Sequence, residues 1–226
     1  MTIELAIYDM DRTITYHPTW TPFLIHAACR RQKWRLLFLP LVALAMLSYL
    51  MHFISRGRLK EITHALLLGR HIAPKDLAPL AESFAEETIL NNIRPGALKS
   101  IEADRKAGRR LVMATASYRL YADLIAKKLG FDDVIATNST IRKDGHLIAR
   151  IEGENNYGPA KLRMILAWMT ASDLERQNCH IRFYSDHVSD EPVFQWSDAP
   201  FAINPCRRLA VLAKKEGWPC LDWKHN

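Results

Sequence analysis

The chain has 226 residues, of which 49% are hydrophobic and 24% are charged, and its formal net charge is +7. This composition is that of a globular protein and excludes a disordered chain. The length suits one α/β domain with an insertion, or two small domains. The positive charge favours an anionic partner, which could be a phosphate compound, an anionic membrane surface or a nucleic acid.

Taken in chain order, the apolar runs predict strands that alternate with helices. Residues 3–8 read as a short buried strand, and residues 16–92 then read as almost wholly helical. The remaining expected elements are a helix at 96–108, a strand at 110–115, a helix at 119–130, a strand at 133–137, a helix at 158–169, and strands at 181–185 and 201–204. Alternating strands and helices predict an α/β fold with a central parallel sheet covered on both faces.

Polar and charged side chains gather where three of these strands end. They are Asp9 and Asp11 after the first strand, Thr115 and Ser117 after the second, Asp186 and Asp190 after strand 181–185, and Lys161 in the helix before that strand. Taken singly, each is more often a turn residue, a helix cap or a solvated charge. Because ligands bind beyond the carboxyl ends of parallel strands, we expect the whole set to converge on one edge of the sheet.

Four converging carboxylates would repel one another strongly unless a cation lay among them. Hard oxygen ligands with room for water and phosphate suit Mg²⁺. The sequence therefore predicts a magnesium site formed by carboxylates at this edge.

Four segments resemble, in order, the motifs of the haloacid dehalogenase (HAD) superfamily of aspartate-nucleophile phosphatases. They are "DMDRT", "LVMATAS", "YGPAKLRMIL" and "YSDHVSDEP". The segment "FAINPCRRLAVLAKKEGWPCLDW" is similar to subfamily IB, the phosphoserine-phosphatase-like branch. The resemblance implies a Rossmann-like catalytic core, residues 1–15 and 93–226, with an all-helical cap, residues 16–92, inserted after the first strand.

The resemblance also implies a Mg²⁺-dependent phosphomonoester phosphatase that forms an aspartyl-phosphate. Asp9 would be the nucleophile and Asp11 the general acid and base. Having Asp11 favours hydrolysis, because family members that only transfer phosphate carry Thr there. The phosphate-binding residues would be Thr115 and Lys161, with Ser117 as a further candidate. The metal ligands would be Asp9, Asp186 and the main-chain carbonyl of Asp11, with Asp190 as a secondary ligand.

The predicted cap contains a long apolar stretch, residues 36–54, without any Asp, Glu, Lys or Arg and with basic residues on both sides. As a helix it would be about 28 Å long, close to the thickness of a bilayer core. A single crossing would put Asp9 and Asp186 on opposite sides of the membrane, so we exclude it. The stretch is expected to be a buried cap or dimer helix, or to contact an anionic membrane surface.

The substrate is predicted from this cap. Phosphatases of phosphatidylglycerophosphate are similar in having a long apolar stretch soon after the first motif, which favours a lipid phosphomonoester. A soluble small-molecule phosphatase of the phosphoserine-phosphatase type is the alternative, and a catalytically inactive membrane-associated scaffold is a remote one. Arg58 and Arg70 are candidate cap contacts to substrate or membrane.

Partners and location complete the expectations. No nucleic-acid partner is expected, because no RRM, KH, zinc-finger or helix-turn-helix signature is present. The four cysteines lack CxxC spacing, and the amino-terminal segment does not read as a signal peptide. We therefore expect a cytoplasmic protein, with peripheral contact to the inner face of the membrane if the cap binds lipid. The oligomeric state is left open.

Overall fold

A computed structural model describes residues 2–224, which form one eight-stranded sheet. The strands lie side by side in the order β2-β5-β4-β3-β1-β6-β7-β8. Their bounds are β1 Ile3–Tyr8, β2 His71–Ile72, β3 Arg110–Tyr118, β4 Asp133–Ile141, β5 Leu147–Glu152, β6 Cys179–Ser185, β7 Ala199–Ile203 and β8 Cys220–Leu221. The strands from β4 to β8 in this order are parallel, whereas β5 and β2 are antiparallel to their neighbours.

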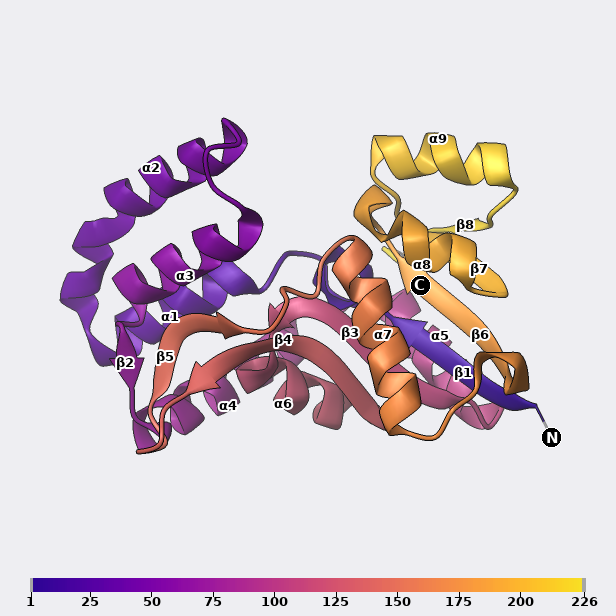
Figure 1. The fold of residues 1–226 in the computed structure, drawn as a ribbon, viewed down its shortest axis with the longest axis horizontal. Coiled ribbons are helices and arrows are strands. Elements are labelled where there is room, and N and C mark those ends of the chain that lie inside the picture. The colour runs from indigo at the N-terminus through magenta and orange to yellow at the C-terminus, as the bar shows by residue number, and fades with distance from the viewer. Residues whose placement is uncertain (1, 225–226) are drawn as a thin grey trace.

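Strand β1 lies at the centre of the parallel part, between β3 and β6 (Figure 1). Its alternate side chains enter two separate cores, since Ala6 and Tyr8 belong to one cluster and Leu5 and Ile7 to the other. A strand that is apolar on both faces must be covered on both. The first core includes side chains of α5 (Pro95–Lys106) and α6 (Arg119–Leu129). The second includes those of α7 (Pro159–Ala171), α8 (Glu191–Trp196) and α9 (Arg207–Glu216).

A buried acid ties β1, β6 and α5 together beneath the sheet. Asp104 of α5 accepts hydrogen bonds from the hydroxyls of Tyr8, at 2.6 Å, and Tyr184, at 2.9 Å. Arg109 also pairs with this carboxylate, at 3.2 Å. Asp104 is almost fully buried, so these contacts replace the hydration that its charge has lost.

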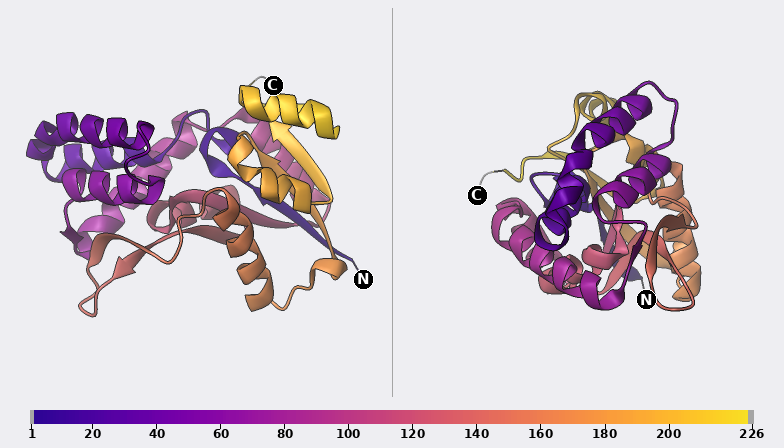
Figure 2. Two further views of the ribbon diagram at one scale, coloured as in Figure 1. Left: turned by 45° about the horizontal axis from the view of Figure 1, so that its top comes forward. Right: turned by 90° about the vertical axis from the view of Figure 1, so that its left-hand side faces the viewer.

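The segment between β1 and α5, here called the insertion, lies at one end of the sheet, and the carboxyl-terminal helices lie at the other (Figure 2). Its helices are α1 (Trp20–Arg31), α2 (Leu39–Leu50), α3 (Arg56–Leu67) and α4 (Pro74–Asn91), and a 3₁₀ turn over Lys33–Phe38 leads into α2. The expected all-helical insertion also contains β2, which pairs with β5. Gly69, with φ of 109°, turns the chain after α3 and Pro74 begins α4, so the short connection between them is free to pair with that strand.

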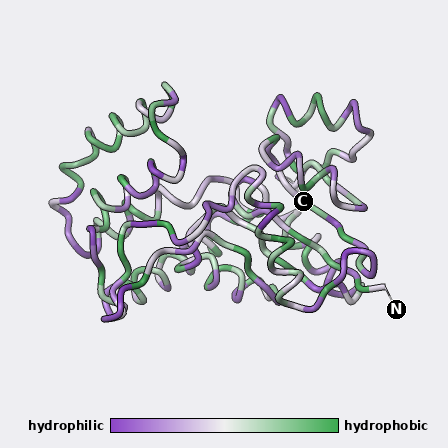
Figure 3. Tube along the Cα trace, in the orientation of Figure 1, coloured by the Kyte–Doolittle hydropathy of each residue, from purple (hydrophilic) through white to green (hydrophobic). Residues whose placement is uncertain are grey.

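The apolar helix α2 lies on the outside of the insertion (Figure 3). Only Ala45 of this helix is buried, and Leu44 and Leu50 are 58% and 65% exposed. The expectation of a helix buried inside the cap is therefore wrong for this chain by itself. Helix α2 packs on α3 along one side only, because the interior of the insertion is already filled by side chains of α1, α3 and α4. Residues Lys33–Leu50 are the one described stretch with the length and composition of a membrane span, and 11% of it is buried.

Candidate active site

A cavity of about 600 Å³ opens where β1, β3 and β6 end, between the sheet and the insertion. Its sheet side is lined by Asp9, Asp11, Arg12, Ala116, Ser117, Tyr157, Lys161, Asp186, His187, Ser189 and Asp190. Its insertion side is lined by Pro18, Trp20, Thr21, Met46, Tyr49, Leu50, Arg56, Leu59 and Lys60. Of the strand-end side chains expected to converge, all except Thr115 line this cavity.

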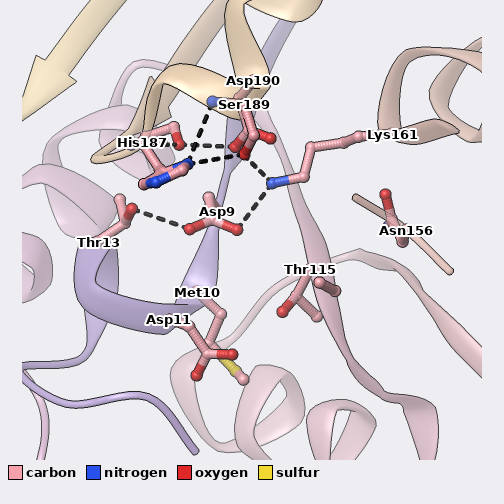
Figure 4. Close-up of polar contacts among 12 residues, drawn as sticks. Asp9, Met10, Asp11, Thr13, Thr115, Asn156, Lys161, His187, Ser189 and Asp190 are labelled. Carbon is pink, nitrogen blue, oxygen red and sulfur yellow. Dashed lines mark hydrogen bonds and ion pairs between the residues drawn. The ribbon is translucent and has the colours of Figure 1, made fainter. Parts of the chain in front are cut away.

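Asp9 follows β1 directly and continues its pairing, since its N–H donates to the carbonyl of Tyr184 at 2.9 Å. One carboxylate oxygen accepts from Lys161 Nζ at 2.8 Å, and the other accepts from Thr13 Oγ1 at 3.0 Å (Figure 4). Thr13 comes close because the chain turns sharply after β1, with Arg12 in the left-handed region at φ of 66°. These contacts hold the Asp9 carboxylate in one orientation at the edge of the cavity.

Asp186, after β6, lies close to Asp9. Thr13 Oγ1 lies 3.0 Å from Asp9 Oδ2 and 3.4 Å from Asp186 Oδ1, so a single hydroxyl group contacts both carboxylates. Burial raises the pKa of Asp186 to about 7, and the nearby charge of Asp9 adds to this. Burial also raises the pKa of Asp9, although Lys161 opposes the shift.

Lys161, in the first turn of α7, joins Asp9 to Asp190. Its ammonium is 2.8 Å from the first carboxylate and 2.6 Å from the second, and all three side chains are buried. Burial alone would lower the pKa of Lys161, but the charges of Asp190 and Asp9 outweigh it and raise the pKa. The two flanking carboxylates therefore favour the charged form of Lys161 and fix its position.

The oxygen atoms around Asp9 fit a hard divalent cation. Among residues 2–224 no three Asp, Glu, His or Cys side chains are grouped as a metal centre. Thr13 Oγ1 contacts both the Asp9 and the Asp186 carboxylates, and hard oxygen donors of this kind suit Mg²⁺. Asp190 is bound through Oδ2 to Lys161 and to Ser185, and its buried Oδ1 has no hydrogen-bond partner among the described residues. Such an acceptor also fits a site completed by solvent or a cation.

Asp11 faces the insertion rather than Asp9. One oxygen accepts from the N–H and hydroxyl of Thr19, at 2.7 and 2.8 Å, and the other accepts from Ser117 Oγ at 2.7 Å. Asp11 and Thr115 lie on one side of Asp9 in Figure 4, and Asp190 lies on the other. Thr115 is fully buried, and its hydroxyl accepts from the N–H of Ser117 at 3.0 Å.

The two insertion arginines expected at the site do not line this cavity. Arg58 pairs with Glu61 one turn along the same helix, at 3.1 Å, and Arg70 is exposed after α3. Arg56 and Lys60 line the cavity instead. Helix periodicity contained this signal, because Lys60 belongs to the buried stripe of α3 and Arg58 lies off it. Thr13, inside the first motif, was also missed as a site residue.

Comparison with known proteins agrees with this geometry. A model of the haloacid dehalogenase-like hydrolase family matches residues 6–195. The chain belongs to the haloacid dehalogenase-like hydrolase family. This family member is 29% identical over 171 residues to phosphoserine phosphatase SerB1 of Mycobacterium tuberculosis, with 76% of this chain and 53% of the relative covered. It thus spans about half the length of that relative.

Two solved structures confirm the α/β fold of this family member. A protein of unknown function from Bordetella pertussis Tohama I has a TM-score of 0.87 at 24% identity, covering 99% of this chain and 100% of that one. A phosphoserine phosphatase solved as a phospho-aspartyl intermediate analogue has a TM-score of 0.64 at 15% identity, covering 100% and 95%. Both likenesses extend over nearly the whole chain.

Proposed function

We propose that this chain hydrolyses phosphomonoesters through a phosphoenzyme formed on Asp9. The observation that carries this proposal is the position of the Asp9 carboxylate, which lies between Lys161 and Thr13 and beside Asp186 at the edge of the cavity. Membership of the hydrolase family and the phosphatase names of its relatives support the same reaction class.

The reaction takes place in two displacements at phosphorus. In the first, an Asp9 oxygen forms a bond to phosphorus, the bond from phosphorus to the ester oxygen breaks, and Asp11 gives a proton to the departing alkoxide. In the second, Asp11 accepts a proton from water, the water oxygen bonds to phosphorus, and the bond to Asp9 breaks. Asp11 suits both steps because Thr19 and Ser117 hold its carboxyl group at the wall of the cavity.

The remaining site residues bind the phosphoryl oxygens and compensate their charge. Lys161 presents a fixed positive charge next to Asp9, where negative charge develops. Thr115 and Ser117 lie at the end of β3, where the Ser117 hydroxyl lines the cavity beside Asp11 and the Thr115 hydroxyl accepts from the Ser117 N–H. Mg²⁺, held by Asp9, Asp186 and the Asp11 carbonyl with Asp190 nearby, would offset the charge of the phosphate group. Without a cation, burial raises the pKa values of both Asp9 and Asp186, and the charge of Asp9 adds to the shift of Asp186.

For the substrate, we propose a phosphomonoester with an apolar portion, such as a lipid phosphate of the phosphatidylglycerophosphate type. Met46 and Leu50 of α2 line the cavity, and Leu50 is also largely exposed, so apolar surface continues from the cavity to the outside. The same exposed helix supports contact with an anionic membrane. The alternative, a small soluble substrate, is supported by the phosphoserine phosphatase name of a relative. The intact set of charged site residues is not expected of an inactive scaffold.

Release of phosphate from 4-nitrophenyl phosphate in the presence of Mg²⁺ tests the reaction. We expect turnover that is lost with EDTA and in Asp9→Asn, because the amide cannot attack phosphorus. Asp144→Asn is the matched control, since Asp144 is exposed in the β4–β5 hairpin and should leave turnover unchanged. Turnover by Asp9→Asn at the rate of the unmodified chain would overturn the proposal.

The lipid proposal has a separate test. We expect the chain to hydrolyse phosphatidylglycerophosphate in mixed micelles more efficiently than O-phosphoserine, and to sediment with anionic vesicles at low salt. Leu44→Glu and Leu47→Glu should weaken sedimentation, because a charge on the outer face of α2 opposes insertion into the interface. A preference for O-phosphoserine, together with protein that stays wholly in the supernatant, would contradict this substrate class.

A further inference from the structure

Helix α3 brings two positive charges to the insertion side of the cavity. Lys60 is 5% exposed, and its ammonium donates to the carbonyl of Ala116 and to Asn155 Oδ1, the latter at 2.8 Å. Arg56, one turn earlier, lies with its guanidinium 4.1 Å from the ring centroid of Tyr157. Both residues line the cavity that contains Asp9.

Neither cation is paired with an acid. No carboxylate of the described residues lies within 4.0 Å of the Lys60 ammonium or the Arg56 guanidinium as an ion pair. An ammonium group has three donors, and the two acceptors that Lys60 contacts are neutral oxygens. Burial lowers the pKa of Lys60 to about 7, with Arg56 adding to the effect. A buried cation without a counter-charge is costly, so an anion beside it would be strongly favoured.

Among the described residues, helices α1, α2 and α3 contribute no acidic side chain to the cavity lining. Within residues 2–224, the acidic residues of that lining are Asp9, Asp11, Asp186 and Asp190. The rest of the insertion side is apolar, as at Met46, or uncharged. A substrate ammonium group placed beside α3 would meet two cations, and the Asp11 carboxylate across from them is already held by Thr19 and Ser117.

We propose that Arg56 and Lys60 form a subsite for a second anionic group, a carboxylate or a further phosphate, on the leaving-group side of the phosphomonoester. The proposal rests on the phosphatase function inferred above and specifies its substrate class. Asp9 and Lys161 bind the phosphoryl group that is transferred, and α3 binds the second anion across the cavity. The pair of cations also discriminates against substrates that carry an ammonium group at that position, because helices α1, α2 and α3 supply no carboxylate to receive it.

A matched set of substrates tests this subsite. 3-Phosphoglycerate and glycerol 3-phosphate differ by a carboxylate in place of a hydroxymethyl group, and phosphoethanolamine carries an ammonium group. For the unmodified chain we expect kcat/KM to be on the order of tenfold higher for 3-phosphoglycerate than for glycerol 3-phosphate, mainly through KM. Phosphoethanolamine should be the poorest of the three.

Variants of the two cations locate the effect. In Lys60→Met and Arg56→Met the ratio between the first two substrates should fall toward one, whatever the absolute rates, and Lys60→Arg should keep most of it. Arg58→Met is the control, because Arg58 lies on the same helix but outside the cavity, and it should keep the full ratio. The ratio cancels losses that come from folding or from a shift of Ala116.

Three results would overturn the proposal, and they are distinguishable. Hydrolysis of 4-nitrophenyl phosphate with equal kcat/KM for the matched pair refutes the subsite and leaves the phosphatase function intact. A preference for 3-phosphoglycerate that survives in Lys60→Met and Arg56→Met places the anion elsewhere. Absence of hydrolysis of every phosphomonoester overturns the phosphatase function and this inference together.

Discussion

Replacing Lys161 by Met removes the positive charge that Asp9 and Asp190 share. The ammonium lies 2.8 and 2.6 Å from the two carboxylates, and the side chains of Lys161 and Asp190 are each 3% exposed. Methionine keeps most of the apolar stem but leaves two buried carboxylates without their counter-charge. Breaking a buried ion pair from one side costs about 3–5 kcal/mol, so we expect Lys161→Met to lose that much unfolding free energy near neutral pH.

The loss should depend on pH in a defined direction. Without the ammonium, the pKa of Asp9, which burial already raises to about 6, rises further. At a pH near 5 the carboxyl group of the folded variant is then protonated, the buried charge disappears, and the deficit relative to the unmodified chain shrinks. Urea denaturation in EDTA at pH values of about 5 and 7.5 measures both quantities.

A surface pair of the same length is the control. Lys128 lies 2.7 Å from Glu82, with the two side chains 31% and 47% exposed. Because solvent screens this pair, Lys128→Met should cost much less than Lys161→Met and show little change between the two pH values. Adding Asp190→Asn to Lys161→Met should recover part of the loss, since one stranded carboxylate is removed. A deficit for Lys161→Met that matches the control, or that grows as the pH falls, would refute the electrostatic account of this site.

Three further predictions concern stability. First, the pKa values of Asp9 and Asp186 are higher in the folded chain than in the unfolded chain when no metal is bound. In the pH range between the two sets of pKa values the folded chain holds protons that the unfolded chain has lost, so the stability of the folded chain falls as the pH rises through about 6–7. Mg²⁺ competes with these protons, so the rise in Tm on adding Mg²⁺ should grow between about pH 5.5 and 7.5, and an equal rise at both would contradict the site. Second, the lowered pKa of Lys60 means that the unfolded chain binds the extra proton between about pH 7 and 10.5. The unmodified chain should therefore gain stability over Lys60→Met with rising pH in that window, by up to about 1.4 kcal/mol per pH unit in urea denaturation. A constant difference would show that burial does not lower the pKa of Lys60. Third, Asp104→Asn weakens the contacts with Tyr8, Tyr184 and Arg109 and should cost about 3 kcal/mol in the same assay, whereas a cost near zero would show that this cluster does not hold β1 to α5.

The position of the residues that follow the strands could be predicted from the sequence, because the carboxyl ends of parallel strands lie at the same edge of the sheet. An apolar run of residues 3–8 flanked by Asp9 leaves little freedom in where that carboxylate lies, and β1 has the expected bounds. Neighbouring strands are longer than expected, since β3 continues to Tyr118 and β4 to Ile141. The short strand β8 and the antiparallel strand β5 were missed, because short or half-exposed runs carry weak periodicity.

Orientation within the insertion was harder to predict because it depends on helix phase and on packing partners. Arg56 and Arg58 are two positions apart on α3, so they point in different directions, and only the former lines the cavity. The apolar stretch shows the same limit. Its composition predicts removal from water, but whether α1 and α4 leave room for it depends on contacts far apart in the chain, and in the structure they do not cover α2.

The central claim is that Asp9 itself carries the phosphoryl group during turnover. The most direct test is to quench the chain in acid during turnover of 4-nitrophenyl phosphate with Mg²⁺ and to locate added phosphate by peptide mass spectrometry. We predict one phosphoryl group on the peptide that contains Asp9, and none in Asp9→Asn. Phosphate found on another residue would contradict the account. So would an Asp11→Asn variant, in which the second displacement is expected to be slow, that hydrolyses the substrate rapidly without any labelled peptide.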